Sequence, residues 1–392
     1  MYYVFRIFSR ITTWIAIPAL FAAAWFSIHL ARADAEFRRG DPDSVARAIA
    51  IEPRNTEYLA LRALELDYAG EDAAPALERA ASLSPMSSSP RIRLGLAAEI
   101  RGDYASAERW LLDAARVDRQ FEPRWTLANF YFRRENARAF WVWMRAALEV
   151  SYGDRRPAFE LCWRMGGADE ILSLAIPDRH EVMAAYLAFT LDSHRDSIAP
   201  VAMKLARFHD SGDAPLLLAA CDALIEANDA TRAIELWRAM GYAAPTGVFN
   251  GAFSSAPLNR GFDWRAIESP GVTHSSIDQP RSVHRISLDG RQPESCALLI
   301  QVLNLEPRAR YLLKWEVQMS GGVSLSGHGF QSGIEWRMGD QRAAVGPAST
   351  GEAAFTAPSS LAPLTLYYQR PSGQARAEGW IDLNRVSIER AR

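Results

Sequence analysis

The stretch AAPALERA at residues 73–80 returns as AERWLLDA at residues 107–114, and this recurrence decides the fold of the first half of the chain. The two stretches share three residues at matching positions: Ala73, Leu77 and Ala80 in one, and Ala107, Leu111 and Ala114 in the other. A small residue is needed where helices cross closely, and the leucine fills the gap between neighbouring hairpins. A period of 34 residues therefore predicts helical hairpins that stack on one another.

The period and the shared residues resemble the tetratricopeptide repeat (TPR). Pro85 follows the first stretch and Leu94-Gly95 precedes the second, where the TPR pattern has similar residues. The resemblance implies a TPR-like α-solenoid over residues 33–243, with weaker copies of the unit on either side of the two clear ones. The concave face of such a solenoid binds an extended peptide or another protein, and the repeat itself carries no chemistry.

Aromatic residues are dense between Trp125 and Trp143, and two interpretations stay open for them. They pack the core between adjacent hairpins, or some of them line the groove of the solenoid. In the second interpretation Tyr131 and Trp141 contact the protein partner, and Arg134 belongs to a basic turn that meets an anionic group.

Residues 11–31 contain no Asp, Glu, Lys or Arg, and a run of about 20 residues is long enough to cross a bilayer as a helix. We therefore expect residues 1–32 to form a short tail and a transmembrane anchor. A cleaved signal peptide is the alternative, because Ala31-Arg32-Ala33 and Ala33-Asp34-Ala35 resemble cleavage sites. The apolar run is long for a signal peptide, which favours the anchor. Arginines flank the run almost equally and do not decide its orientation.

The composition is that of a packed globular protein, with 49% hydrophobic and 23% charged residues. A length of 392 residues predicts more than one domain. The formal net charge is −2, so we expect no nucleic-acid partner. The three cysteines lie far apart in the sequence, so neither a disulfide framework nor a structural zinc site is expected.

The helical pattern stops near Pro245, and short apolar or alternating runs separated by Gly, Ser and Pro follow it. Runs of this length at this spacing predict an antiparallel β-sandwich over residues 244–392. The expected architecture is therefore multidomain: a transmembrane helix, a TPR-like α-solenoid and a β-sandwich.

Three stretches of the last region resemble jelly-roll carbohydrate-binding modules with a galactose-binding-like fold. They are Phe249–Phe253 (FNGAF), Leu305–Tyr311 (LEPRARY) and Ile381–Ile388 (IDLNRVSI). The chain departs from the usual pattern at Arg308, where glycine is common, and at Asn384, where an acidic residue is frequent. The resemblance implies a module that binds sugars with aromatic ring faces, helped by amides, carboxylates or arginines.

Trp264 is the main candidate for an exposed sugar-binding platform, because it lies in the loop-like stretch GFDWR. Asp263 and Arg265 on either side of it are predicted to bind the same glycan. His328 and Trp336 flank a glycine-rich segment and are the next candidates. Modules of this kind often carry a structural calcium ion, for which Asp382 and Glu294 could supply oxygen ligands. No acidic cluster supports that ion, so we predict no metal site and no cofactor.

The sequence contains no Walker loop and no HExxH, GxSxG or GxGxxG motif, and its histidines are scattered. A glycosidase needs two carboxylates at a defined separation, and no pair is suggested, so we do not expect an enzyme. The order of anchor, solenoid and sandwich resembles membrane-anchored repeat proteins of Gram-negative bacteria that are thought to act in exopolysaccharide assembly and export.

The preferred hypothesis from the sequence is a non-catalytic scaffold on the bacterial inner membrane. It would pass the membrane once, with its soluble part in the periplasm, a protein partner on the solenoid and a glycan on the sandwich. Two alternatives stay open. One is a purely structural subunit whose sandwich caps the last hydrophobic face of the solenoid and binds no sugar. The other is an unrecognised glycan hydrolase that uses Glu316 or Glu335.

Overall fold

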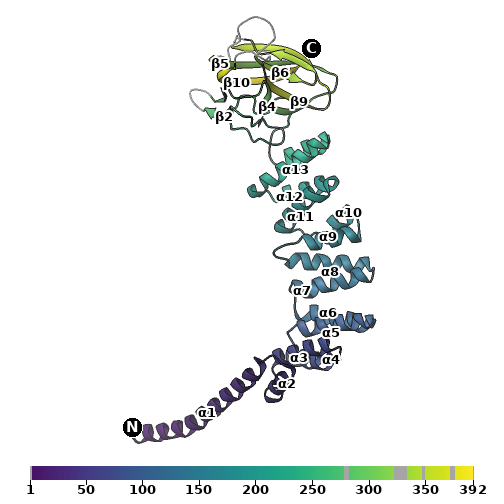
Figure 1. Ribbon diagram of the computed structural model, residues 1–392, viewed down its shortest axis with the longest axis vertical. Helices are drawn as coiled ribbons and strands as arrows, with labels where there is room; N and C mark the ends of the chain where they lie inside the picture. Colours follow the sequence, from purple (N-terminus) through teal and green to yellow (C-terminus); the bar gives the residue numbers. More distant parts are fainter. Residues whose placement is uncertain (1, 278–281, 322–332, 347–348, 371–375, 392) are drawn as a thin grey trace. The chain divides into compact units, whose positions relative to one another are not determined.

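The computed structural model describes residues 2–277, 282–321, 333–346, 349–370 and 376–391. The chain folds as two compact units, Met1–Pro177 and Asp178–Arg392. Helices make up the first unit and the beginning of the second, and strands follow them (Figure 1).

The first unit consists of antiparallel helical hairpins that begin at the end of a long N-terminal helix. Its elements are α1 (Tyr2–Phe37), α2 (Pro42–Ile51), α3 (Thr56–Ala69), α4 (Ala74–Leu83), α5 (Ser89–Ile100), α6 (Tyr104–Val117), α7 (Phe121–Arg133), α8 (Ala137–Val150), α9 (Arg156–Met165), α10 (Ala168–Glu170) and a π-helical turn, Ile171–Ala175. The segment Ala16–Phe37 of α1 is long and apolar enough to cross a membrane, as either an anchor or a signal sequence would be.

The residues shared by the two stretches at 73–80 and 107–114 pack between the helices. Leu77, Ala107 and Leu111 are buried. A Cβ atom on Gly95 of α5 would lie 2.7 Å from the Leu111 side chain, so glycine is needed where α5 crosses α6. The predicted solenoid is confirmed, and its physical basis is this close crossing of helices.

Side-chain caps set where the second helix of several hairpins begins. Asp41, Asp103 and Asn136 each accept a hydrogen bond from a backbone N–H in the first turn of α2, α6 and α8. Such a cap satisfies one of the N–H groups that a helix start leaves without an intrahelical partner. Asp or Asn at these three positions therefore fixes the first residue of each helix.

The second unit begins with further helical hairpins where the repeat pattern fades from the sequence. They are α11 (His180–Ser193), a 3₁₀ turn (Arg195–Ser197), α12 (Ile198–Ala206), a second 3₁₀ turn (Ser211–Asp213), α13 (Ala214–Glu226) and α14 (Ala230–Ala239). The short 3₁₀ turns change the spacing between helices, which is why a 34-residue template no longer fits this part of the chain.

The strands form an antiparallel sandwich of two sheets, as the sequence predicts. Sheet 1 has the order β1-β4-β9-β6-β7 and sheet 2 the order β2-β3-β10-β5-β8. The strands are β1 (Arg265–Ala266), β2 (Val272–Ile277), β3 (Val283–Asp289), β4 (Ser295–Asn304), β5 (Arg310–Gly321), β6 (Gly333–Met338), β7 (Gln341–Ala344), β8 (Thr350–Thr356), β9 (Leu361–Gln369) and β10 (Glu378–Arg390).

A cluster of aromatic rings joins the last helical hairpin to the chain that leads into the sandwich. Trp237 of α14 is fully buried and stacks on Tyr242 with 4.1 Å between ring centroids. Phe249 and Phe262 meet the same indole edge-on at 5.1 and 5.7 Å. The predicted boundary at 243/244 therefore lies inside the second unit, between α14 and β1.

A carboxylate reinforces this junction. Asp222 of α13 accepts hydrogen bonds from the Gly261 backbone N–H at 2.7 Å and from the Arg265 guanidinium at 2.7 Å, and it pairs with Arg260 at 3.1 Å. The last hairpin and the start of the sandwich thus share both a hydrophobic core and an ion-pair network.

We predict that Trp237→Ala destabilises the second unit by roughly 3–5 kcal/mol, because it removes a fully buried indole and leaves a cavity. Urea unfolding of the full chain in detergent measures the change. Tyr152→Ala is the control, because the Tyr152 side chain is exposed and its truncation should change the stability by less than about 0.5 kcal/mol. Equal effects of the two changes would contradict the shared core.

Candidate functional site

The stretch around Trp264 is a structural corner of the sandwich. The Trp264 side chain has no exposed surface, stacks on Phe253 at 5.6 Å and donates a hydrogen bond from Nε1 to the Asn250 carbonyl at 3.3 Å. Asp263 is also buried, and its carboxylate accepts from the backbone N–H groups of Leu258 and Trp264. Burial raises the pKa of Asp263, and these hydrogen bonds oppose the rise.

The expectation of an exposed Trp264 platform is therefore wrong. The chain before β1 folds back over the sandwich, and the indole fills that end of the core. Arg265 turns toward α13 and pairs with Asp222, so it too has a structural partner. Trp336 of β6 is fully buried between Trp264 and Trp315 and cannot offer a ring face to a sugar. His328 lies outside the described residues.

The outer face of sheet 2 carries the polar side chains that alternate with this core. On β10, Ile381 and Leu383 point inward, so Trp380 and Asp382 point outward. Arg285 of β3 donates two hydrogen bonds of 2.7 Å to the Asp382 carboxylate, and its guanidinium lies 4.4 Å from the Trp380 ring. Trp380 is half-buried, whereas Trp264, Trp315 and Trp336 are buried.

A groove of about 520 Å³ lies on the same face, between β5, β8 and β10. Charged and hydroxyl side chains line it: Lys314, Glu316, Thr350, Glu352, Arg385, Ser387 and Glu389. The strand register explains the gathering, because Arg385 stands opposite Glu316 and Lys314 stands opposite both Ser387 and Glu352. Lys314 Nζ pairs with Glu389 at 3.0 Å.

Three charged groups of the groove are available to a ligand. Arg385, Glu316 and Glu352 are exposed, and none of them forms an ion pair with another residue in the described part of the chain. Trp315 also borders the groove, and a Cβ atom on Gly351 would lie 2.5 Å from its indole. Glycine at 351 therefore lets β8 pass close to the ring on the core side of the sheet.

The carboxylates considered for a hydrolase do not form a pair. Glu316 lies on the outer face of sheet 2, whereas Glu335 alternates with the core residues Ile334 and Trp336 and lies on the outer face of sheet 1. Glu335 is also held by Arg337. Because the core separates the two carboxylates, they cannot flank one glycosidic bond.

The two residues considered for calcium are held by arginines. Both oxygens of Asp382 accept from Arg285, and Glu294 pairs with Arg370 at 3.2 Å. Within the described ranges, no three His, Cys, Asp or Glu side chains gather in a way that could hold a metal ion. Asp382 and Glu294 therefore have cationic partners already.

Two histidines of sheet 2, His274 in β2 and His284 in β3, lie next to each other on its core side. This pair was not predicted from the sequence. The His284 side chain is buried, stacks on Phe253 at 5.6 Å and lies 3.1 Å from His274, measured from His284 Nε2 to His274 Nδ1. Burial and the neighbouring His274 lower the pKa of His284 to about 4. Burial also lowers the pKa of His274. The neutral pair belongs to the folded core.

In the solenoid, Tyr131 and Trp141 belong to the core. Both are buried, Tyr131 donates a hydrogen bond of 2.6 Å to Glu108, and Trp141 packs edge-on against Phe140 at 4.8 Å. Burial, followed by the Glu108 hydrogen bond, raises the pKa of Tyr131. The groove-lining interpretation is wrong for these two rings, because they fill the space between hairpins.

Arg134 lies at the surface, and its guanidinium covers the ring of Tyr104 at 3.7 Å. The solenoid exposes other apolar side chains that the sequence reading missed. Tyr68 and Ile100, at the carboxyl ends of α3 and α5, are 86% and 87% exposed, and Leu64 is 42% exposed. We call these three residues the apolar rim. The signal in the sequence that predicts the apolar rim is a large apolar residue at a helix end, outside the positions that pack on the neighbouring helix.

Solved structures similar to this chain fall into two groups. The first group includes the TPR protein YrrB, described as having an unusual peptide-binding site (13% identity, TM-score 0.27, 51% of this chain and 92% of that one). The second group includes carbohydrate-binding modules: a CBM4 structure (12%, 0.26, 37% and 99%) and the CBM6 of Cellvibrio mixtus lichenase 5A in complex with cellotriose (12%, 0.20, 32% and 92%).

No protein-family model and no curated protein matches the chain. The fold is established by the helices and strands described above. By these elements, the chain is a TPR-like α-solenoid followed by an antiparallel β-sandwich of two five-stranded sheets.

We predict that the sandwich loses stability as the pH falls from about 6.5 to about 4. His284 has a lower pKa in the folded chain than in the unfolded one, so in this window the unfolded chain binds more protons. The loss from His284 should reach roughly 3 kcal/mol at the acid end. His284→Gln cannot titrate and should show a smaller loss in urea unfolding across this range. His209→Asn, at an exposed histidine, should keep the original dependence, and an unchanged profile in His284→Gln would contradict the assignment.

Proposed function

We propose that the protein is a non-catalytic, membrane-anchored scaffold whose solenoid binds a protein partner and whose sandwich binds a glycan. The observation that carries the glycan part is the groove between β5, β8 and β10, where three unpaired charged groups and two hydroxyl side chains face solvent together. The proposed glycan site is therefore the outer face of sheet 2 and not the surroundings of Trp264.

The chemistry of this face suits a chain of hydroxyl groups. The Arg385 guanidinium offers donors in a fixed planar fork, and the Glu316 and Glu352 carboxylates accept from neighbouring sugar hydroxyls. Ser387 can both donate and accept. Trp380, at the other end of β10, provides the half-buried ring against which a pyranose can pack. Binding of this kind needs no metal ion, so chelation should leave it unchanged.

The apolar rim is the proposed contact for a protein partner. Tyr68 and Ile100 each follow an acidic residue that is already paired, since Asp67 binds Arg93 and Glu99 binds Arg133. The rim therefore presents apolar side chains on a surface whose neighbouring charges are satisfied, which suits a partner with a complementary apolar strip.

The proposed setting is the periplasmic face of a bacterial inner membrane, in exopolysaccharide assembly or export. Two features support it. The side chains of residues 16–28 in α1 are exposed in the folded chain although most of them are apolar, and the outer face of sheet 2 carries the groove that we propose as the glycan site.

A purely structural role is the second candidate, and the Trp237 cluster favours it. In that case the sandwich covers the apolar end of the last hairpin and binds no sugar. The first candidate function requires the outer face of sheet 2 to bind a glycan, and the second does not.

Retention of the full chain, in detergent, on gels that contain bacterial exopolysaccharides tests the proposal. We expect retention by at least one polymer, with and without EDTA. Arg385→Ala and Trp380→Ala should each weaken it at least about tenfold, a loss of roughly 1.4 kcal/mol or more. Both side chains point outward, so the fold should stay intact.

Arg342→Ala is the matched control, because Arg342 lies on the outer face of sheet 1 and its side chain is 54% exposed. Its retention should equal that of the unchanged protein. Folded protein that no polysaccharide retains, or Arg385→Ala and Trp380→Ala variants that bind fully, would reject the glycan site and favour the structural role.

A further inference from the structure

The long helix α1 has two parts with different surroundings. The side chains of residues 16–28 are exposed, but Ala33 is fully buried against Ala48 and Tyr58. Phe37, at the end of the helix, packs on the Tyr58 ring with 4.5 Å between centroids. The last turns of α1 are therefore the first helix of the solenoid, and no linker separates them from the apolar part.

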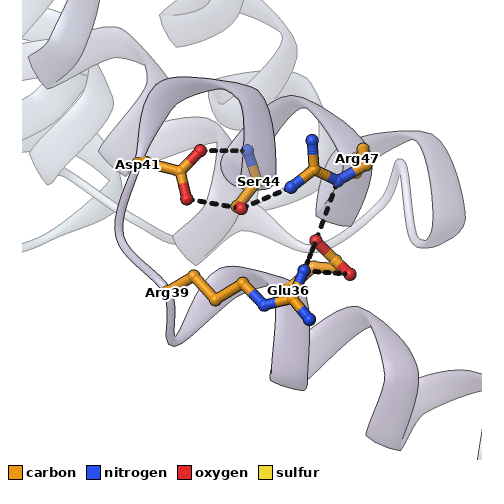
Figure 2. Close-up of polar contacts among 5 residues, drawn as sticks. All are labelled: Glu36, Arg39, Asp41, Ser44 and Arg47. Atoms are coloured by element: carbon orange, nitrogen blue, oxygen red, sulfur yellow. Dashed lines mark hydrogen bonds and ion pairs between the residues drawn. The ribbon is translucent and has the colours of Figure 1, made fainter.

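Polar contacts fix the turn between α1 and α2 (Figure 2). Glu36 of α1 accepts hydrogen bonds of 2.8 Å from Arg39 and from Arg47, which reaches across from α2. Arg47 also donates to the Ser44 hydroxyl, and Asp41 caps α2 by accepting from Ser44. The direction of α2 relative to the end of α1 is thus held by side chains of both helices.

The helix α2 runs back along α1. At its end, the Ile51 carbonyl accepts a hydrogen bond from Nε2 of His29 at 2.9 Å. The turn 52–55 that follows is therefore level with His29. His29 lies only three residues before Arg32, the first charged residue after the apolar run, which is about 4.5 Å along the helix. In a membrane, this level is the boundary between hydrocarbon and headgroups.

Three arginines surround this level. Arg32, Arg54 and Arg79 are exposed, and none forms an ion pair with another residue that the structure describes. Arg79 Nε lies 3.4 Å from the Pro53 carbonyl, so Arg79 belongs to the same corner as the turn. Glu52 is the acidic residue of the turn, and its Oε1 accepts a hydrogen bond of 3.3 Å from the Arg54 backbone N–H.

We propose that this corner, made of the turn 52–55 with Arg32 and Arg79, rests on the bilayer and binds the phosphates of anionic lipid headgroups. The inference rests on the proposed membrane anchoring and goes beyond it, because it gives the first hairpin a lipid-contact surface and excludes a flexible stalk. It also requires α1 to stay uncleaved, since cleavage after Ala33 would remove a core residue and the His29 contact.

Depth measurements on the full chain in vesicles test the proposal. The vesicles contain equal amounts of phosphatidylcholine and phosphatidylglycerol, and a nitroxide is attached at Arg54→Cys in a chain with Cys296→Ser, the other two cysteines being buried. The control label is at Glu71→Cys, which is exposed beyond the far end of α3, about 20 Å from the turn. Circular dichroism checks that both labelled chains are folded.

We expect the label at 54 to be several-fold less accessible to a water-soluble nickel quencher than the label at 71, and to become more accessible when phosphatidylglycerol is omitted. Equal accessibility at both sites, in chains that float with the vesicles, would overturn the lipid contact and leave the anchor intact. A chain isolated from bacterial membranes whose first residue is Asp34 or Glu36, and which no longer floats, would overturn the anchor as well.

Discussion

Stacked helical hairpins bury each apolar face against the next hairpin, and this arrangement leaves two end faces that the repeat itself cannot cover. At the first hairpin and at the last one, segments outside the repeats pack on the apolar surface. In the first unit, the end of α1 places Ala33 and Phe37 against the first hairpin. In the second unit, rings from the chain before the sandwich surround Trp237 of the last hairpin. The terminal segments are therefore part of the folding of the helices.

The strands of the sandwich divide their residues between the core and the outer faces of the two sheets. Its tryptophans at 264, 315 and 336 fill the interior, and the alternation of the strands sends charged residues to the outer face of sheet 2. Arg285 and Asp382 satisfy each other there, whereas Arg385 and Glu316 do not use their charges on neighbours. Arg285 and Asp382 therefore form an ion pair, whereas Arg385, Glu316 and Glu352 line the groove without one among the described residues.

Much of the fold followed from the sequence because its signals are local. The alanine and leucine spacing reports helix crossings directly, and the alternating runs report strands. The prediction of Trp264 and Trp336 as exposed sugar-binding rings was wrong for a physical reason. A tryptophan in a loop-like stretch carries no sign of whether the loop folds back, and the partner that fixes this loop, Asp222, lies on another element far along the chain.

The groove itself could not be predicted, because it depends on strand register. Glu316 and Arg385 meet only because β5 pairs with β10 after a bulge between Leu383 and Arg385. Composition and periodicity do not give such a pairing. The same limit applied to Tyr131, since a dense run of aromatic residues fits a core and a groove equally well until the hairpins are packed.

The double use of α1 has a consequence for how this chain can vary among its descendants. The side chains of residues 16–28 do not pack on the solenoid, so many different apolar sequences could replace them. Residues 29–37 must in addition fit Ala48 and Tyr58 and keep the hydrogen bond to Ile51. The N-terminal segment is therefore not an exchangeable cassette: a foreign leader or lipid anchor joined at this point would bring the wrong surface to the first hairpin. We therefore expect homologous proteins with this first hairpin to retain the end of α1 as well.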